Sequence, residues 1–162
     1  MQTFRHATAP AIFLALTLIS PTVWTAEQPL PAGQISVVPS ELKWTDAPSI
    51  GPGAKIAVIE GDFKAAGPIT FRLKLPAKTR IAVHTHPMIE HVTVLAGTFY
   101  LGIGEKFEAS KARAYPAGGI TVIPPGMPMY AYTKEKETVI QVHGVGPWGI
   151  NYLNPDDAPK KK

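Results

Sequence analysis

Two histidines and a glutamate fall within the seven residues 84–90, and both are residue types that ligate metal ions. Alternate side chains of a β-strand face the same side, so His84 and His86 direct both imidazoles toward one point. Pro87 helps to end that strand because it lacks a backbone donor, and Glu90 then opens the returning strand beside His86. Two imidazoles and a carboxylate suit a first-row divalent ion, so the sequence predicts a metal site on His84, His86 and Glu90.

Beyond residues 1–26, two further histidines stand outside this set. His91 has the opposite strand parity from Glu90, which predicts a place on the surface or behind the ligands. His143 shares one face of an expected strand with Gln141, and either face of that strand could point inward. His143 is therefore either a hydrogen-bonded structural residue near a strand end, or a replacement ligand or proton-transfer group in the site.

The segments that must position these residues are short and β-rich. Apolar runs alternate with breakers, and the 17 prolines argue against long helices. The pattern predicts an all-β sandwich or barrel. The expected strands cover Lys55–Glu60, Ile69–Leu75, Thr79–His86, Glu90–Ala96, Thr98–Ile103, Gly119–Ile123, Met129–Thr133 and Glu137–Val145.

With these residues in place, the chain resembles a single-domain cupin over about residues 54–153. The first cupin motif, G-x5-H-x-H-x3-E-x6-G, is matched in spacing by the three expected ligands and Gly97. The second motif, G-x5-P-x-G-x2-H-x3-N, is matched by Gly118, Pro124 and Gly126. The resemblance implies a small antiparallel β-barrel, a jelly roll, with a metal inside one mouth. The segments Val94–Gly104 and Gln141–Ile150 also resemble a group of exported bacterial cupins.

Three motif positions depart from the pattern. Lys78 replaces the first glycine, and Met129 and Thr133 take the places of the histidine and asparagine of the second motif. Met129 either fills the core as a flexible packer or coordinates through its thioether, which would favour copper(I). If Met129 does not coordinate, the remaining two imidazoles and one carboxylate leave open positions, an arrangement that resembles the facial triad of iron(II) oxygenases.

The N-terminal residues of the chain predict export. Residues 1–26 join a weakly basic start to a short apolar stretch and a small, polar end, which is typical of a secretory signal. Its apolar stretch is too short to span a bilayer, so no membrane span is expected after cleavage. We expect a periplasmic or secreted protein with an extension at 27–53 across the barrel, the cupin domain at 54–153 and a basic tail at 154–162.

Composition excludes several classes of function. The net charge is only +4, and no basic patch is interleaved with aromatic residues, so nucleic acid is not an expected partner. Cysteine is absent from the sequence, which excludes disulfides and thiolate ligands.

Several functions remain open. The first is an enzyme that binds a divalent metal (Fe, Mn, Zn or Cu) and a small organic ligand in the barrel mouth, such as an oxidoreductase of the dioxygenase type. The alternatives are a non-catalytic module that binds or senses a metal or metabolite, and a cupin that has lost its metal. The resemblance also implies a possible homodimer through edge strands.

Overall fold

The structure, a computed structural model, describes residues 32–159, and these form strands and short 3-10 helices. The strands are β1 (Thr45–Asp46), β2 (Lys55–Glu60), β3 (Gly67–Leu75), β4 (Arg80–Thr85), β5 (Glu90–Ala96), β6 (Thr98–Ile103), β7 (Arg113–Pro116), β8 (Ile120–Ile123), β9 (Met129–Tyr132), β10 (Thr138–Gly146) and β11 (Asn151–Tyr152). The 3-10 helices are η1 (Pro39–Glu41), η2 (Ala109–Lys111) and η3 (Pro155–Asp157).

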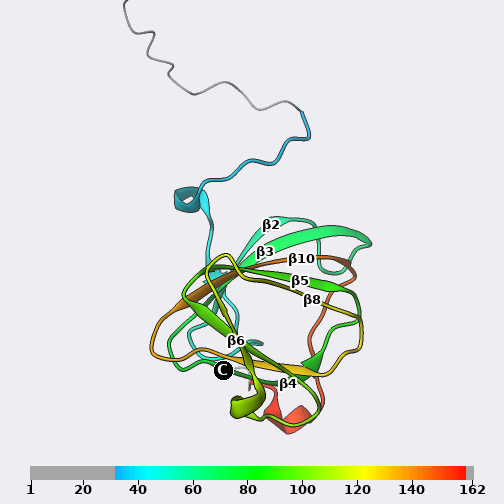
Figure 1. The fold of residues 1–162 in the computed structure, drawn as a ribbon. Helices are drawn as coiled ribbons and strands as arrows, with labels where there is room; N and C mark the ends of the chain where they lie inside the picture. Colours follow the sequence, from blue (N-terminus) through cyan, green and yellow to red (C-terminus); the bar gives the residue numbers. More distant parts are fainter. Residues whose placement is uncertain (1–31, 160–162) are drawn as a thin grey trace, which may run out of the picture. The chain divides into compact units, whose positions relative to one another are not determined.

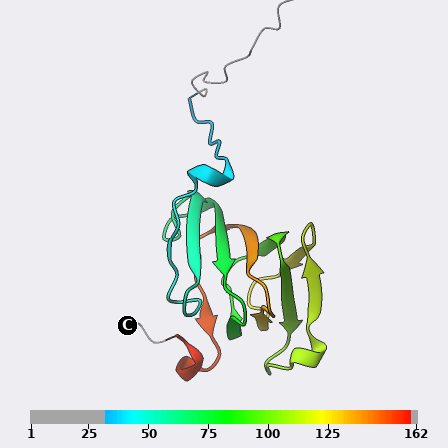
Figure 2. The same ribbon diagram turned by 90° about the vertical axis from the view of Figure 1, so that its left-hand side faces the viewer.

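The strands make two antiparallel sheets that face each other. Sheet A has the order β1-β2-β3-β10-β5-β8, and sheet B has the order β11-β4-β9-β6-β7. In Figure 1, β2, β3, β10, β5 and β8 form one layer, and β4 and β6 lie in the facing layer. Figure 2 shows the same strands from the side. This arrangement is a jelly-roll barrel, and it confirms the predicted all-β fold.

Strand alternation builds the core between the sheets. In β3 every second residue from Ile69 to Leu75 is buried, and the residues between them are more exposed. β10 follows the same rule in the neighbouring register, where Ile140 pairs with Leu73 and Val142 with Phe71. The inner faces of both strands therefore contribute large apolar side chains to one layer, whose burial is the main stabilising term.

Gly97 makes the corner between the sheets. It separates β5, in sheet A, from β6, in sheet B, and its φ is +75°. A Cβ there would lie 2.5 Å from the carbonyl oxygen of Glu137. Both the positive φ and the close approach require glycine, which accounts for this position of the first motif.

Lys78 occupies a turn that suits glycine better. Its φ is +61°, the only positive φ of a non-glycine residue among the described residues. Two hydrogen bonds hold the turn in place. The Lys78 amide donates to Lys134 O at 2.7 Å, and Thr133 Oγ1 donates to Pro76 O at 2.6 Å. Thr133 also accepts a hydrogen bond from the Thr79 amide at 3.0 Å. Thr133, in the place of the motif asparagine, thus has a structural role here.

We predict that Lys78→Gly raises the free energy of unfolding by about 0.5–1 kcal/mol. Glycine adopts this φ without strain, and the relief of strain exceeds the additional backbone entropy that glycine loses on folding. The ion pair of Lys78 with Glu135 is 3.3 Å long and exposed, so its loss is a minor effect. Urea denaturation measures the change. Lys78→Ala is the control, since it removes the same ion pair and keeps the Cβ. Equal stability of the two variants would contradict backbone strain at this turn.

Some predictions are not tested by this structure. The predicted signal at residues 1–26 lies outside the described residues, as do the three terminal lysines. Among residues 32–159, no helix has the length and apolar character needed to cross a membrane. β8 is an edge strand of sheet A and exposes Ile120 and Val122. The structure describes a single chain, so the predicted homodimer through edge strands stays a prediction.

Candidate functional site

His84 points into the barrel because β4 carries an irregularity. Ile81 pairs with Ala131 of β9, but the next pairing joins His84 to Met129, so β4 advances three residues while β9 advances two. An extra residue of this kind reverses the alternation of a strand. Ile81 and His84 therefore both line the interior, although their spacing would place them on opposite faces of a regular strand.

A backbone carbonyl fixes the orientation of the His84 ring. Its Nδ1 lies 2.7 Å from Ala82 O, and because a carbonyl can only accept, Nδ1 carries the proton. The other ring nitrogen, Nε2, then has a lone pair that is free to bind a metal or a ligand proton. Burial lowers the pKa of His84 to about 4, so this imidazole is neutral at neutral pH.

His86 is held in the same way by a distant segment. Its Nδ1 donates to Gly149 O at 2.6 Å, and its ring stacks on Trp148 with centroids 4.6 Å apart. The Trp148 amide in turn donates to Phe63 O at 2.7 Å, which ties this segment to the loop between β2 and β3. Burial lowers the pKa of His86 too. The sequence motifs do not indicate this support of His86 by Trp148.

Glu90 lies close to the two imidazoles, but it comes from the other sheet. The sequence had suggested that the returning strand, β5, lies beside β4. Instead β4 belongs to sheet B and β5 to sheet A, so the two strands do not form a hairpin. Glu90 Oε1 lies 3.8 Å from His86 Nε2, and the two imidazole centroids are 5.0 Å apart. Burial alone raises the pKa of Glu90 to about 8.

The donor types of this cluster suit a divalent ion, but their arrangement is not yet a coordination shell. Both imidazoles are neutral, and a backbone carbonyl behind each one resembles the support that metal-ligating histidines normally have. Within residues 32–159, however, no three His, Asp or Glu side chains are arranged so that they could hold a metal as they stand. A metal would have to draw His84, His86 and Glu90 closer together.

Met129 stands directly opposite His84 in the pairing of β4 and β9. Only 2% of its surface is exposed, and it both packs in the core and lines the interior cavity. The thioether is thus beside the predicted ligands, and the two sequence-based alternatives, packing and coordination, both remain compatible with its place.

The two other histidines among residues 32–159 lie away from the cluster. His143 is exposed on β10, and its Nδ1 is 3.1 Å from Thr70 Oγ1 while its Nε2 is 2.8 Å from Gln141 Nε2. Ile140 and Val142 occupy the inner face of this strand, so His143 is on the outer face and is not among the residues that line the cavity. His91 pairs with His143 across β5 and β10 on the same outer face.

An interior cavity of about 330 Å³ adjoins the cluster. His84, His86 and Glu90 line it together with Met129 and a predominantly apolar set of side chains from both sheets. A volume of this size is at the lower end of the range for small-molecule sites. The cluster therefore faces a space that a small organic molecule can occupy.

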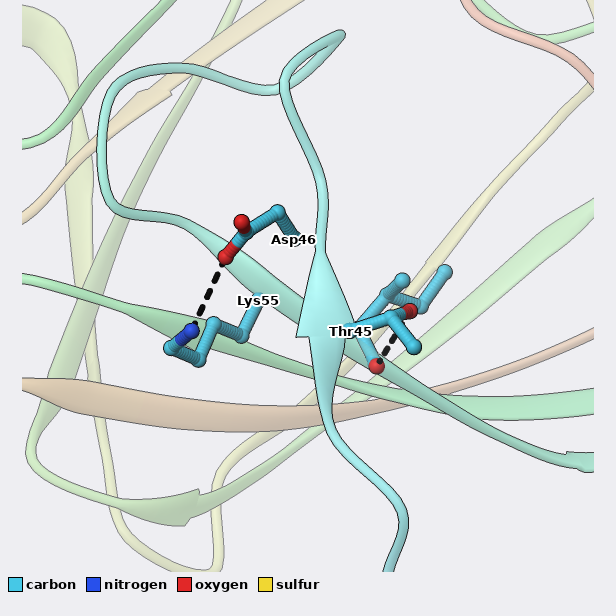
Figure 3. Close-up of polar contacts among 4 residues, drawn as sticks. Thr45, Asp46 and Lys55 are labelled. Atoms are coloured by element: carbon cyan, nitrogen blue, oxygen red, sulfur yellow. Dashed lines mark hydrogen bonds and ion pairs between the residues drawn. The ribbon is translucent and has the colours of Figure 1, made fainter.

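Residues 46–50, here called the strap, form one wall of this cavity. Figure 3 shows how the strap is tied to β2: Lys55 Nζ lies 2.9 Å from Asp46 Oδ1, and Thr45 Oγ1 donates to Ile56 O at 3.4 Å. Tyr152 Oη donates to Ser49 O at 2.8 Å at the other end. Part of the expected N-terminal extension thus contributes directly to the site.

Comparisons with solved structures identify the architecture. The chain superposes on an RmlC-like cupin from Shewanella frigidimarina with a TM-score of 0.54 at 15% identity, covering 67% of this chain and 87% of that one. The polyketide cyclase RemF from Streptomyces resistomycificus gives a TM-score of 0.65 at 14% identity, covering 78% and 89%. KdgF from Halomonas sp. gives 0.54 at 16%, covering 67% and 91%. The chain has the cupin fold.

At these identities the likeness to these structures extends to the fold alone. No protein-family model and no curated protein sequence matches the chain. The function of this chain must therefore be argued from its own site, since one scaffold supports many activities.

We predict that the metal-free protein loses stability as the pH rises from about 7 to 8. The unfolded Glu90 carboxyl ionises near its ordinary pKa of 4.5, whereas the folded one keeps its proton until about 8. The folded state therefore holds a proton that the unfolded state has lost, and stability falls with pH by up to about 1 kcal/mol over this unit. The buried histidines, with lowered pKa values, are mostly neutral in both states there.

Urea denaturation in the presence of a chelator measures this pH dependence. The variant Glu90→Gln cannot ionise, so its free energy of unfolding should change much less between about pH 7 and 8. The same slope in both proteins would show that Glu90 ionises in the folded state as readily as in water.

Proposed function

We propose that this cupin is a metal-dependent enzyme that acts on a small organic molecule inside the barrel. One observation carries the proposal: two imidazoles, each fixed with Nε2 available, and a buried carboxylate line the same cavity. Burial raises the pKa of Glu90 to about 8, so its carboxyl group holds a proton at neutral pH. A divalent ion beside the carboxyl group would replace that proton.

The residues around the cluster would divide the work. His84, His86 and Glu90 would hold the ion, which supplies Lewis acidity or, as iron(II), oxidation by dioxygen. The carbonyl oxygens of Ala82 and Gly149 keep both rings oriented. The apolar walls hold the body of the substrate and exclude water, which strengthens the polar interactions at the cluster.

Met129 supports a second candidate, a non-catalytic metal-binding module. It is opposite His84 and lines the cavity, so its thioether could occupy a fourth position and close the site. A soft sulfur ligand favours copper(I) over the harder divalent ions. Zinc, manganese or iron in the purified protein would favour the enzyme, and copper would favour this candidate.

We predict about one metal ion per chain in protein purified without chelator, and none in the double variant His84→Ala/His86→Ala. Elemental analysis of both measures the content and the identity of the metal. His91→Ala is the matched control, because His91 lies on the outer face and should leave the content unchanged. Wild-type protein that stays metal-free after reconstitution with zinc, manganese, iron and copper would rule out the metal-dependent function.

We predict that Met129→His raises the affinity for zinc at least about tenfold, because it supplies a third imidazole opposite His84. Competition with a chromophoric chelator measures the affinity. Met127→His is the control: Met127 packs against the core but does not line the cavity. Equal zinc affinities of the two variants would argue that position 129 lies out of reach of the ion.

We also propose that the site operates in the periplasm or outside the cell. The support is the signal-like pattern of residues 1–26. N-terminal sequencing of the protein from fractionated cells tests it, and a cytoplasmic protein that retains these residues would refute export.

A further inference from the structure

The walls of the cavity restrict what it can hold. Among the described residues that line it, the ionisable side chains are His84, His86 and Glu90 in the interior and Asp46 in the strap. The other lining side chains are almost all apolar, among them Leu73, Leu101 and Ile140, and Ser49 of the strap is a polar exception. Polar contacts with a ligand are therefore concentrated at the histidine–glutamate cluster.

This distribution disfavours polyhydroxylated ligands. A hydroxyl group that leaves water for an apolar wall loses its hydrogen bonds, and each such loss weakens binding. Sugars and sugar acids carry hydroxyl groups along their whole length, so most of them would face side chains such as Leu73, Leu101 and Ile140. The cavity cannot satisfy these groups.

It also disfavours strongly charged ligands. No lysine or arginine is among the described residues that line the cavity, so a ligand with several negative charges has no protein cations to balance them. A cation would be repelled once a divalent ion joins two neutral imidazoles and one carboxylate, since the cluster then carries a net positive charge. An oxygen donor that can bind a metal or donate to an imidazole Nε2 fits the cluster better.

The aromatic lining of the space favours a flat molecule. Aromatic side chains from separate segments line it, among them Phe71 of β3, Phe99 of β6 and Trp148 after β10. Phe63 and Phe71 are in edge-to-face contact with centroids 5.1 Å apart, and such surfaces accept a further ring readily.

We propose that the cavity takes a flat, largely apolar molecule, aromatic or conjugated, that carries its oxygen donors on one edge. The oxygen donors meet His84, His86 and Glu90, and the ring body lies between the apolar faces of the two sheets. This inference rests on the proposed function for the contact between oxygen donors and metal. The apolar part of the site stands without the metal.

Three soluble probes separate the ligand classes. 2,3-Dihydroxynaphthalene has a flat apolar body with two adjacent oxygen donors, gluconate has oxygen donors without that body, and phenyltrimethylammonium has a ring with a cation. Calorimetric titration of each into zinc-loaded and chelator-treated protein compares their affinities. We expect the naphthalenediol to bind at least about tenfold more tightly than either of the others. Equal or tighter binding of gluconate or of the cation overturns the proposal.

A variant that fills the cavity locates the binding. Ala131 is fully buried on β9 and lines the cavity, so Ala131→Leu places a larger side chain in the space that the ring would occupy. Ala114→Leu makes the same change at an exposed position of β7. We expect Ala131→Leu to weaken binding of the naphthalenediol at least about tenfold with its zinc content unchanged, and Ala114→Leu to match wild type.

The outcomes separate this inference from the proposed function. Binding of the naphthalenediol that is equally tight in a folded Ala131→Leu variant means that the probe lies elsewhere, and the inference fails. Wild-type protein that takes up no zinc, yet binds the naphthalenediol with the same sensitivity to Ala131→Leu, refutes the metal-dependent function and supports the ligand class.

Discussion

The site depends on two hydrogen bonds from imidazole Nδ1 atoms to backbone carbonyl oxygens. These bonds, to Ala82 O and Gly149 O, leave each Nε2 with a lone pair that faces the ligand side of the ring. Burial keeps both rings neutral, which a metal ligand requires. Without these acceptors the rings could rotate or exchange tautomers, and the Nε2 lone pairs would no longer be held toward a ligand.

The two carbonyl groups come from different parts of the barrel, and this makes the site a product of the whole fold. Ala82 is on β4 itself, two residues before His84, whereas Gly149 follows β10 in a segment that Trp148 ties to the β2–β3 loop. Glu90 arrives from the opposite sheet, and the strap closes another wall. Barrel closure thus brings together one buried acid, two neutral bases and an apolar cavity, which local structure alone cannot do.

Local patterns predicted most of the strands but not the details that orient the site. Apolar alternation and proline or glycine breakers place β2–β6 and β8–β10 within a few residues, because these signals act within a strand. Two-residue strands such as β1 and β11 have no periodicity to detect. The irregularity that turns His84 inward depends on the β4–β9 register, and the Gly149 carbonyl is a backbone group without a side-chain signature. The sequence left open which face of β10 points inward. The burial of Ile140 and Val142 shows that their face does, so His143 faces outward.

The central claim is that both imidazoles are neutral and present Nε2 to the cavity, ready for a ligand. Long-range ¹H–¹⁵N NMR of selectively labelled metal-free protein at neutral pH reads the tautomer of each ring directly. We expect a protonated Nδ1 and an unprotonated Nε2 for His84 and His86, and a change in both Nε2 shifts when zinc is added. A protonated Nε2 on either ring, or shifts that zinc leaves unchanged, would contradict this claim.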